Sequence, residues 1–329
     1  MFFTENIDLI VNDQWEDLPV FSRQDYIDFQ SDLGKKAGWI ADDTTIVPVA
    51  VSTSKKFRQL QLLYVPTSPF NRLDAKQEKT FLEKAIDFIK EQNLADRIVH
   101  GPTHAIFHGV PEKAVSAPFG TYFLDLTQSE EDLFAGLHSK HRNVVRNAEK
   151  KGVKLKFGFD QFPVFYKLYK ETMERSSMYC EPEKFFMSYI NRQDENVLCG
   201  TAWNGHEPLG AILMPFSKFG AFYVYGASAA RIPINGAINY LHWEAMKNFK
   251  EKGAQRYDFV GARLSDVAGT KLEGIQKFKA RFGASLEEGF IWKMDINPLA
   301  CKVYDGLVAA KLKLKGLSPP KDLVDQEKR

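Results

Sequence analysis

The chain has 329 residues, an apolar content of 44% and a formal net charge of +2 at pH 7. That length is enough for about two domains with substantial cores. The near-zero net charge excludes a generally basic protein, so cations matter only where they cluster. No apolar run approaches the length needed to span a bilayer, and the acidic N-terminal stretch does not look like a signal peptide. Cys180, Cys199 and Cys301 are odd in number and far apart, which suits a reducing compartment. We therefore expect a cytoplasmic protein.

The first elements along the chain are predicted to be a hairpin and then a strand, a helix and a strand. The stretch AGWIADDTTIVPVAVS has apolar runs on both sides of Asp42-Asp43, which would form the turn. After LLYVPTSP, apolar residues recur at helical spacing between residues 81 and 92. The short apolar run RIVH that follows is typical of a strand inside a sheet.

A cluster of cations lies in the middle of the chain. Ser129 and the acids after it predict the start of a helix. Further along, Arg142, Arg146 and Lys150 fall at i, i+4 and i+8 on one helix face, with Lys140 close by. Such a row is either a solvated helix face or a contact for phosphate groups, because its local field does not depend on the net charge of the chain.

The second half repeats the order of elements found in the first half. Val65 falls on Tyr225 and Gly101 on Gly261, an offset of 160 residues in both cases. Asn204-Gly205 marks a hairpin turn, a helix is predicted near residues 240–252, and YDFV follows as a strand. The matching order on both sides predicts a duplicated α/β fold.

The stretch GIQKFKARFGA interleaves aromatic residues and cations close to a glycine. Phe278 and Phe282 are four residues apart, so they share a helical face, while Lys277, Lys279 and Arg281 lie between them. One interpretation is a lysine held by its aromatic neighbours and directed at a negative charge. The other is an amphipathic surface turn with solvated lysines. The histidines have no zinc spacing, so we expect no metal, and neither a Gly-x-Ser-x-Gly elbow nor a Walker loop is present.

The last apolar pattern predicts a helix near residues 298–315. Within PLACKVYDGLVAAKLKLKG, apolar residues recur at spacings of three and four. The residues of this row are Leu299, Val303, Leu307, Ala310 and Leu314.

Four of these motifs, in this order, resemble the Fem-type non-ribosomal peptidyltransferases. They are LHSKHRNVVRNAEKKGV, YVYGAS, YDFVGA and GIQKFKARFGA. The resemblance implies an α/β (α+β) fold of two tandem domains like the GNAT N-acetyltransferases, each a mixed, mostly antiparallel sheet flanked by helices. It places these domains at residues 1–150 and 151–297, with the last helix packing back on the first. It also implies transfer of an amino acid from aminoacyl-tRNA to an amine of a cell-wall precursor.

The same resemblance implies a set of site residues. Lys279 and Phe278 would lie at the acyl-transfer centre, where a fixed cation can stabilise an oxyanion. The cations of the central helix, Lys140, Arg142, Arg146 and Lys150, would bind tRNA or other phosphates. The substrate-binding positions would be Lys36, Glu181, Phe185, Tyr223, Tyr225, Gly226 and Ser228.

The chain departs from the family pattern at one of these positions and at one further place. Glu181 and Phe185 align with a precursor-binding arginine and tyrosine, and an acid there would repel a diphosphate. Gly101-Pro102 aligns with an Asp-Pro pair that supplies a candidate base. Two alternatives therefore stay open: a coenzyme-A-dependent N-acyltransferase acting on a sugar or lipid amine, and a binding protein that has lost catalysis. The first hypothesis requires no cofactor, since the donor is aminoacyl-tRNA.

Overall fold

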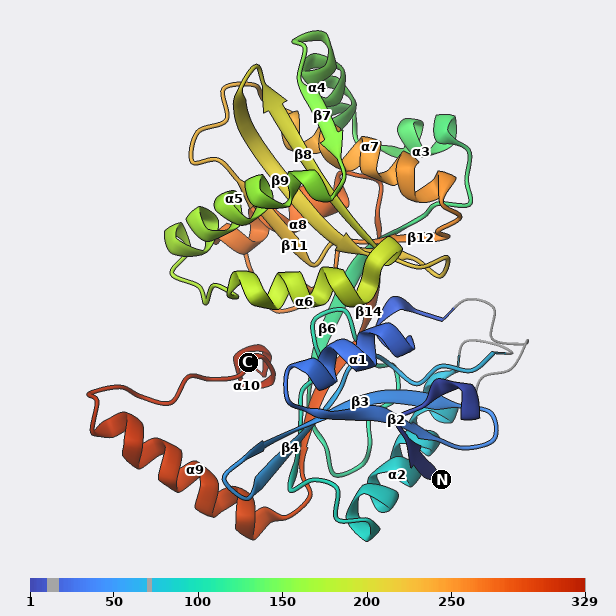
Figure 1. Cartoon of the computed structure of the whole chain (residues 1–329), viewed down its shortest axis with the longest axis vertical. Coiled ribbons are helices and arrows are strands. Elements are labelled where there is room, and N and C mark those ends of the chain that lie inside the picture. The colour runs from blue at the N-terminus through green and yellow to red at the C-terminus, as the bar shows by residue number, and fades with distance from the viewer. Residues whose placement is uncertain (11–17, 70–72, 329) are drawn as a thin grey trace.

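The computed structural model describes residues 1–10, 18–69 and 73–328, without the side chains of residues 193 and 194. Parts of the N-terminal stretch and of the loop at 66–74 therefore lie outside the described residues. The described chain forms two lobes, and two long strands, β6 (Val115–Asp125) and β14 (Ser285–Asp295), run from one lobe to the other (Figure 1).

The lower lobe of Figure 1 consists mainly of residues from the first half of the chain. A small strand, a hairpin and a further strand precede its main helix. Its elements are β1 (Phe2–Thr4), the 3₁₀ helices η1 (Ile7–Leu9) and η2 (Val20–Ser22), α1 (Gln24–Asp32), β2 (Lys36–Ala41), β3 (Ile46–Ser54), β4 (Phe57–Leu62), α2 (Ala75–Glu91) and β5 (Arg97–Val99).

The upper lobe contains most of the elements that follow β6. They are α3 (Glu130–Gly136), α4 (Ser139–Lys150), β7 (Lys154–Phe157), η3 (Phe159–Gln161), α5 (Phe162–Arg175), α6 (Glu183–Gln193), η4 (Asp194–Asn196), β8 (Val197–Asn204), β9 (Glu207–Pro215), β10 (Ala221–Phe222), β11 (Tyr225–Ser228), α7 (Ala237–Glu251), β12 (Arg256–Asp258), β13 (Ala262–Arg263) and α8 (Lys271–Ala280). Beyond β14, α9 (Pro298–Lys313) and α10 (Leu323–Glu327) return to the lower lobe.

The two halves exchange strands in the middle of the larger sheet. Its order is β1-β2-β3-β4-β5-β14-β6-β12-β10, so β14 from the second half lies beside β5, and β6 from the first half lies beside β12. An arginine lies opposite an aspartate at both exchanged pairings. Arg97 is opposite Asp295 in one, and Arg256 is opposite Asp125 in the other. A smaller sheet, in the order β11-β9-β8-β7, belongs to the upper lobe alone.

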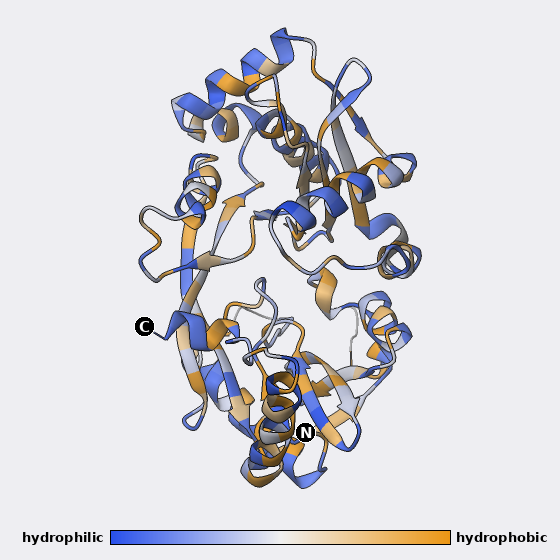
Figure 2. Cartoon of the chain, turned by 90° about the vertical axis from the view of Figure 1, so that its left-hand side faces the viewer, coloured by the Kyte–Doolittle hydropathy of each residue, from blue (hydrophilic) through white to orange (hydrophobic). Residues whose placement is uncertain are grey.

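The buried apolar residues gather in several clusters, and one of them joins the two lobes. This shared core combines α1, β2 and β3 with α5, α6 and β9, and its members include Phe21, Tyr26, Phe165 and Phe186. A second cluster lies between α4, α7 and the sheet of the upper lobe, and a third lies between α2 and the sheet of the lower lobe. Figure 2 colours the ribbon by hydropathy and shows hydrophobic segments, in orange, within both lobes.

Several expectations from the sequence are confirmed. The Asp42-Asp43 and Asn204-Gly205 turns join β2 to β3 and β8 to β9. Gly205 has φ = 57°, a backbone conformation that residues with a side chain rarely adopt. The helices predicted near residues 81–92 and 240–252 correspond to α2 and α7, and the closing helix corresponds to α9.

The domain boundaries drawn from the sequence stay predictions. Two helices that precede residue 150, α3 and α4, contribute to the core of the upper lobe, where α4 packs against α7. The C-terminal α9 contacts β4 of the lower lobe, and Tyr304 stacks on Phe57 with 4.1 Å between the ring centroids. Within the described residues, none of the helices combines the length and apolar character required to cross a membrane.

Candidate active site

The smaller and larger sheets separate at one point in the upper lobe. Phe222 of β10 pairs with Asp258 of β12 in the larger sheet, whereas Tyr225 of β11 pairs with Leu213 of β9 in the smaller one. The chain therefore changes sheets between Phe222 and Tyr225. Because β10 and β11 are the edge strands of their sheets in the described chain, they present backbone groups that a ligand can pair with.

A strained turn follows β12 beside this opening. Val260 has φ = 43°, which is a rare conformation for a β-branched residue, and Gly261 has φ = 58°. The Val260 N–H donates to Oδ1 of Asp258 over 2.8 Å, and the Gly261 N–H donates to the carbonyl of Thr103 over 3.1 Å. Asp258 thus holds a backbone turn. Strain of this kind persists only where the surroundings enforce it, and it is concentrated at functional sites.

Lys279 binds this turn from α8. Its side chain is buried, and Nζ donates to the carbonyls of Val260 and Gly261, the latter over 2.7 Å. Burial lowers the pKa of Lys279 to about 8, and the nearby Asp258 carboxylate opposes that shift. The sequence suggested a lysine directed at a negative charge; in the structure its ammonium group is fixed on two backbone carbonyls. These contacts use two of its three N–H donors.

Phe278 anchors the same helix through packing and through its backbone. Its ring lies 5.1 Å from that of Phe282 and 5.5 Å from that of His242, centroid to centroid. Nε2 of His141, from α4, lies 3.1 Å from the Phe278 carbonyl. Burial lowers the pKa of His242 to about 3, so this imidazole is neutral at physiological pH. The surroundings of Lys279 are therefore apolar and uncharged on the side of α7.

Tyr225 lies in an aromatic wall on the other side of the opening. Its ring is 5.0 Å from that of Phe186 and 6.2 Å from that of Tyr169. Phe185 belongs to the same wall, at 6.5 Å from Tyr225. Burial raises the pKa of Tyr225, and the nearby Tyr26 and Glu181 add to that shift, so the phenol stays protonated.

Glu181 forms the polar end of this wall together with a lysine that the sequence did not single out. Burial raises the pKa of the Glu181 carboxyl, while Lys35 opposes the shift. Burial also lowers the pKa of Lys35, and Nζ of this residue donates to Oε1 of Gln30 over 2.7 Å. The neighbouring Lys36 is exposed instead, with Nζ 4.9 Å from the ring centroid of Phe3. Lys35 directly precedes β2, and Lys36 is the first residue of that strand.

The remaining substrate-binding candidates lie along the strand change itself. Tyr223 and Tyr225 do not share one face, because the chain changes sheets between them. Tyr223 packs against His242 at 4.4 Å, in the core of the upper lobe, whereas Tyr225 faces the shared core. Gly226 lies against the Tyr223 ring, which occupies the space of a Cβ. The Ser228 N–H donates to Oγ1 of Thr172 over 3.1 Å.

The cations of α4 divide into two groups. Nη1 of Arg142 donates to the carbonyls of Ala135 and Leu137, and the Arg146 guanidinium lies 5.0 Å from the Phe134 ring centroid. Both arginines thus fix α3 onto α4. Lys140, Arg146 and Lys150 are exposed and Arg142 is half-buried, so the first three are accessible to a phosphate backbone.

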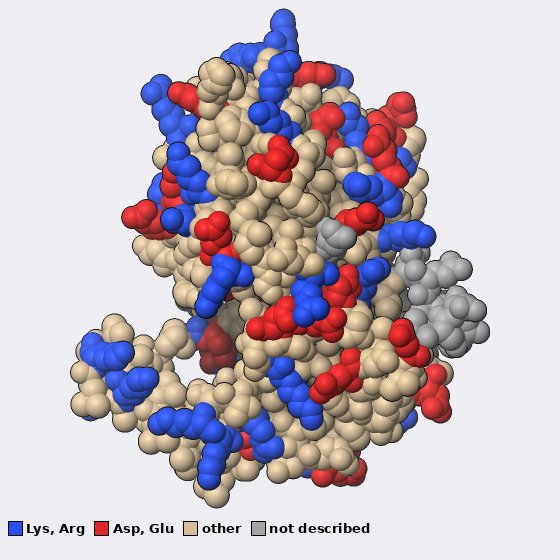
Figure 3. All heavy atoms as spheres, in the orientation of Figure 1, with Lys and Arg blue, Asp and Glu red and all other residues tan. Residues whose placement is uncertain are grey.

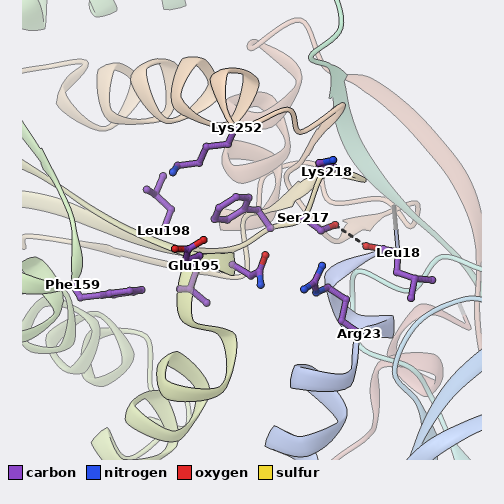
Figure 4. A pocket seen from close by; sticks show the side chains of 11 residues that line it. Leu18, Arg23, Phe159, Glu195, Leu198, Ser217, Lys218 and Lys252 are labelled. Carbon is purple, nitrogen blue, oxygen red and sulfur yellow. Dashed lines mark hydrogen bonds between the residues drawn. The ribbon is translucent and has the colours of Figure 1, made fainter. Parts of the chain in front are cut away.

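Two cavities lie between the lobes. The larger, of about 750 Å³, contains the cations Arg23, Lys218 and Lys252 and the acid Glu195 (Figure 4). It is lined by Leu18, Arg23, Phe159, Glu195, Asn196, Val197, Leu198, Phe216, Ser217, Lys218 and Lys252. The smaller, of about 150 Å³, reaches Asp258 and Arg256 from the lower lobe. The end of β12, at Asp258, therefore borders space between the lobes.

Sequence reasoning missed Arg256, Val260 and Lys35. Arg256 donates to Oδ2 of Asp258 over 2.7 Å and also bonds Glu287, so it fixes the carboxylate that holds the turn. The pair Val260-Gly261 carried a weak signal, since glycine is common where the backbone turns sharply. The strain at Val260 and the orientation of Lys35 give no signal in the sequence, because both depend on contacts between distant segments.

Two family models match the chain. Residues 50–202 match the FemAB family, and residues 139–278 match an acetyltransferase (GNAT) domain. No curated protein sequence matches the chain significantly.

Solved structures with the same fold have low sequence identity to this chain. FemX is 14% identical with a TM-score of 0.69, over 92% of this chain and 98% of that one. The C-terminal domain of a putative lysylphosphatidylglycerol synthetase from Agrobacterium fabrum is 13% identical with a TM-score of 0.54, over 88% and 94%. L-PGS from Bacillus licheniformis is 13% identical with a TM-score of 0.50, over 82% and 86%. Similarity at these identities establishes the fold alone.

The fold and both family matches define a tandem GNAT-like protein, which confirms the predicted fold class. The match of residues 50–202 to the FemAB family confirms the resemblance to Fem-type proteins seen in the sequence, and FemX shares the fold.

Proposed function

We propose that this protein is an aminoacyl-tRNA-dependent acyltransferase that adds an amino acid to an amine of a cell-wall precursor or a related acceptor in the cytoplasm. The observation that carries the proposal is the buried ammonium of Lys279, fixed on the strained turn at the opening between the two sheets. The match of residues 50–202 to the FemAB family supports the reaction class.

In this reaction the acceptor amine attacks the carbonyl carbon of the aminoacyl ester. A C–N bond forms, the C–O bond to the terminal ribose of the tRNA breaks, and the proton lost by the amine balances the one gained by the ribose oxygen. The intermediate carries a negative oxygen. A cation that is already held in position stabilises such an oxygen without reorganisation, and removing one contact of this kind typically slows a reaction by about 10²- to 10³-fold.

Lys279 has the properties that this role requires. Two of its N–H donors bind backbone carbonyls, so the third is directed by a fixed side chain. Phe278 and Phe282 pack on each other and on the core of the upper lobe, which fixes the segment that carries Lys279. The exposed Lys277, by contrast, forms an ion pair with Glu273 on the outer face of α8.

Glu181 and Tyr225 are our candidates for binding the acceptor amine. A carboxylate attracts an ammonium group, and its raised pKa makes Glu181 a stronger base than an exposed glutamate. Tyr225 offers a protonated hydroxyl beside it. An acid at this position favours recognition of an amine over recognition of a diphosphate.

A second candidate function is supported by the match of residues 139–278 to a GNAT acetyltransferase domain. In this alternative, an acyl-coenzyme A donor would pair with the edge strand β11 and acylate a sugar or lipid amine.

Binding measurements on the full chain distinguish the two donors. We expect unfractionated aminoacylated tRNA to raise the melting temperature of the protein, and acetyl-coenzyme A at about 1 mM, on the order of 1,000-fold above a micromolar Kd, to leave it unchanged. A melting shift with acetyl-coenzyme A and none with tRNA would reverse the assignment. The Lys140→Gln/Lys150→Gln variant serves as a matched control for tRNA contact.

A further inference from the structure

The C-terminal helix α9 carries an apolar row on its outer surface. Leu299, Val303 and Leu307 are 75%, 57% and 62% exposed, although such residues are normally buried. Their spacing of four residues puts them on one helical face, which Leu314, directly after the helix, continues at 90% exposure. The row that predicted this helix from the sequence therefore faces solvent and not the body of the protein.

The opposite face of α9 attaches the helix to the lower lobe. Cys301 is buried, with Sγ 3.2 Å from the Asp96 carbonyl. Asp305 accepts two hydrogen bonds from Arg97, at 2.8 and 2.7 Å. The stacking of Tyr304 on Phe57 completes the attachment. The outward direction of the apolar row is thus imposed by specific contacts.

Lysines border the apolar row on both sides. At 100° per residue, Lys302 and Lys313 lie on one side of the row and Lys311 lies on the other. All three are exposed, and Lys315 follows directly after the helix. The only acid within Pro298–Lys313 is Asp305, which Arg97 neutralises on the inner face. Figure 3 shows α9 and the chain after it as an arm that stands off the body, with lysines along it.

We propose that α9 docks on the surface of an anionic membrane. In a helix that lies in the lipid interface, apolar side chains enter the acyl region while flanking lysines extend to the headgroups. The lysines complement acidic phospholipids, and α9 has no unpaired acid to oppose them. A second copy of this chain fits the surface less well, because two such helices would bring their lysine borders together. This inference is independent of the proposed reaction.

The helix can dock without unfolding, because the chain is fixed on both sides of it. The side chain of Asn297 caps its N-terminus, and beyond its C-terminus α10 packs on β6. Arg263 and Lys293 secure α10 through ion pairs with Glu327 and Asp325. A membrane would therefore meet a preformed surface, which lowers the entropy lost on binding.

Flotation with lipid vesicles tests the proposal. We expect the full chain to float with vesicles of 30% phosphatidylglycerol in phosphatidylcholine, and to float much less with phosphatidylcholine alone. Leu307→Asp should lower the partition coefficient by about 10- to 100-fold, the value of one buried leucine. Leu9→Asp is the matched control, since Leu9 is 71% exposed on η1, away from α9, and its replacement should leave binding unchanged.

Charge is tested with a second matched pair. Replacing Lys302, Lys311 and Lys313 by Gln should lower binding to the anionic vesicles by about 100-fold, and 0.5 M salt should do the same to the original protein. Replacing the exposed Lys76, Lys84 and Lys90 of α2 by Gln removes the same charge elsewhere and should have little effect. Circular dichroism confirms that each variant is folded.

Three results would overturn the proposal. The first is equal flotation of the Leu307→Asp and Leu9→Asp proteins, and the second is equal flotation with neutral and anionic vesicles. The third is a dimer in sedimentation that Leu307→Asp dissociates, in a protein that binds no vesicles, since the row would then join two copies of the chain.

Discussion

The two halves of this molecule use the strand before their main helix in different ways. In the first half, β4 pairs with β3 on one side and with β5 on the other, so the sheet is continuous. In the second half the corresponding segment is divided: β10 pairs with β12, and β11 pairs with β9. A duplicated fold has thus kept one closed sheet and opened the other, and the candidate chemistry lies at the opening.

The ion pairs of the two halves also differ in how exposed their carboxylates are. Arg97 and Arg256 occupy reciprocal positions on β5 and β12. The partners of Arg97, Asp295 and Asp305, have side chains that are 45% and 56% exposed, whereas the side chain of Asp258, beside Arg256, is 3% exposed. Similar residues therefore attach a surface helix in one half and organise a buried turn in the other.

The largest expected effect comes from breaking the buried ion pair between Asp258 and Arg256. Asp258→Ala leaves Arg256 with one carboxylate partner fewer and should lower the free energy of unfolding by about 3–5 kcal/mol. The matched change Asp305→Ala removes an exposed partner and should cost less than about 1 kcal/mol. Urea denaturation measures both, and equal costs would remove the distinction between the halves.

Removing the cation at the opening should affect rate more than folding. We expect Lys279→Met to slow single-turnover acyl transfer by about 10²- to 10³-fold. Lys277→Met is the matched control and should change the rate less than about twofold, because Lys277 lies in an exposed pair with Glu273. Equal small effects from the two substitutions would exclude a catalytic role for Lys279.

The change of sheets also depends on a glycine. A Cβ at Gly226 would overlap the ring of Tyr223, so Gly226→Ala should destabilise the protein by about 1–3 kcal/mol. Gly274→Ala is the control: Gly274 lies within α8 with open space around it, and alanine there should be neutral or stabilising. If Gly226→Ala left the stability of the protein unchanged, the side chains around the opening would be able to repack.

The pKa of Lys279 predicts a pH dependence. Its protonated fraction falls as pH rises through about 8, so the acyl-transfer rate should fall about tenfold per pH unit above that value. Because this folded-state pKa is below the ordinary value of 10.5, folding stability should increase slightly over the same range. In Lys279→Arg the charge persists, and the alkaline fall in rate should disappear. A fall of the same shape in that variant would assign it to another group.

The smallest effect is expected on the outer surface of α4. Lys140→Gln/Lys150→Gln should reduce the slope of log K against log salt for tRNA binding by about 1.5. Lys76→Gln/Lys84→Gln, on α2 of the first half, should leave the slope unchanged. Identical slopes for both double variants would leave Lys140 and Lys150 as solvated residues.

Local patterns in the sequence predicted the elements of the fold more completely than the site. The helices and both hairpin turns follow from periodicity and turn residues, which act over a few positions. The conformation of Val260 and the inward side chain of Lys35 depend on contacts with α8 and with residues near Glu181. The exposure of Leu307 was equally hidden, because an apolar row predicts a helix without showing what covers it.

The exchanged strands have a consequence for the synthesis of this protein. While the ribosome is making the first half, the edge of β5 has no partner, because β14 at residues 285–295 completes that pairing. The lower lobe therefore reaches its final form only when nearly the whole chain has emerged, and its open edge is exposed to aggregation until then. A chain that stops before residue 285 would lack the strand between β5 and β6, so neither half is an independent folding unit.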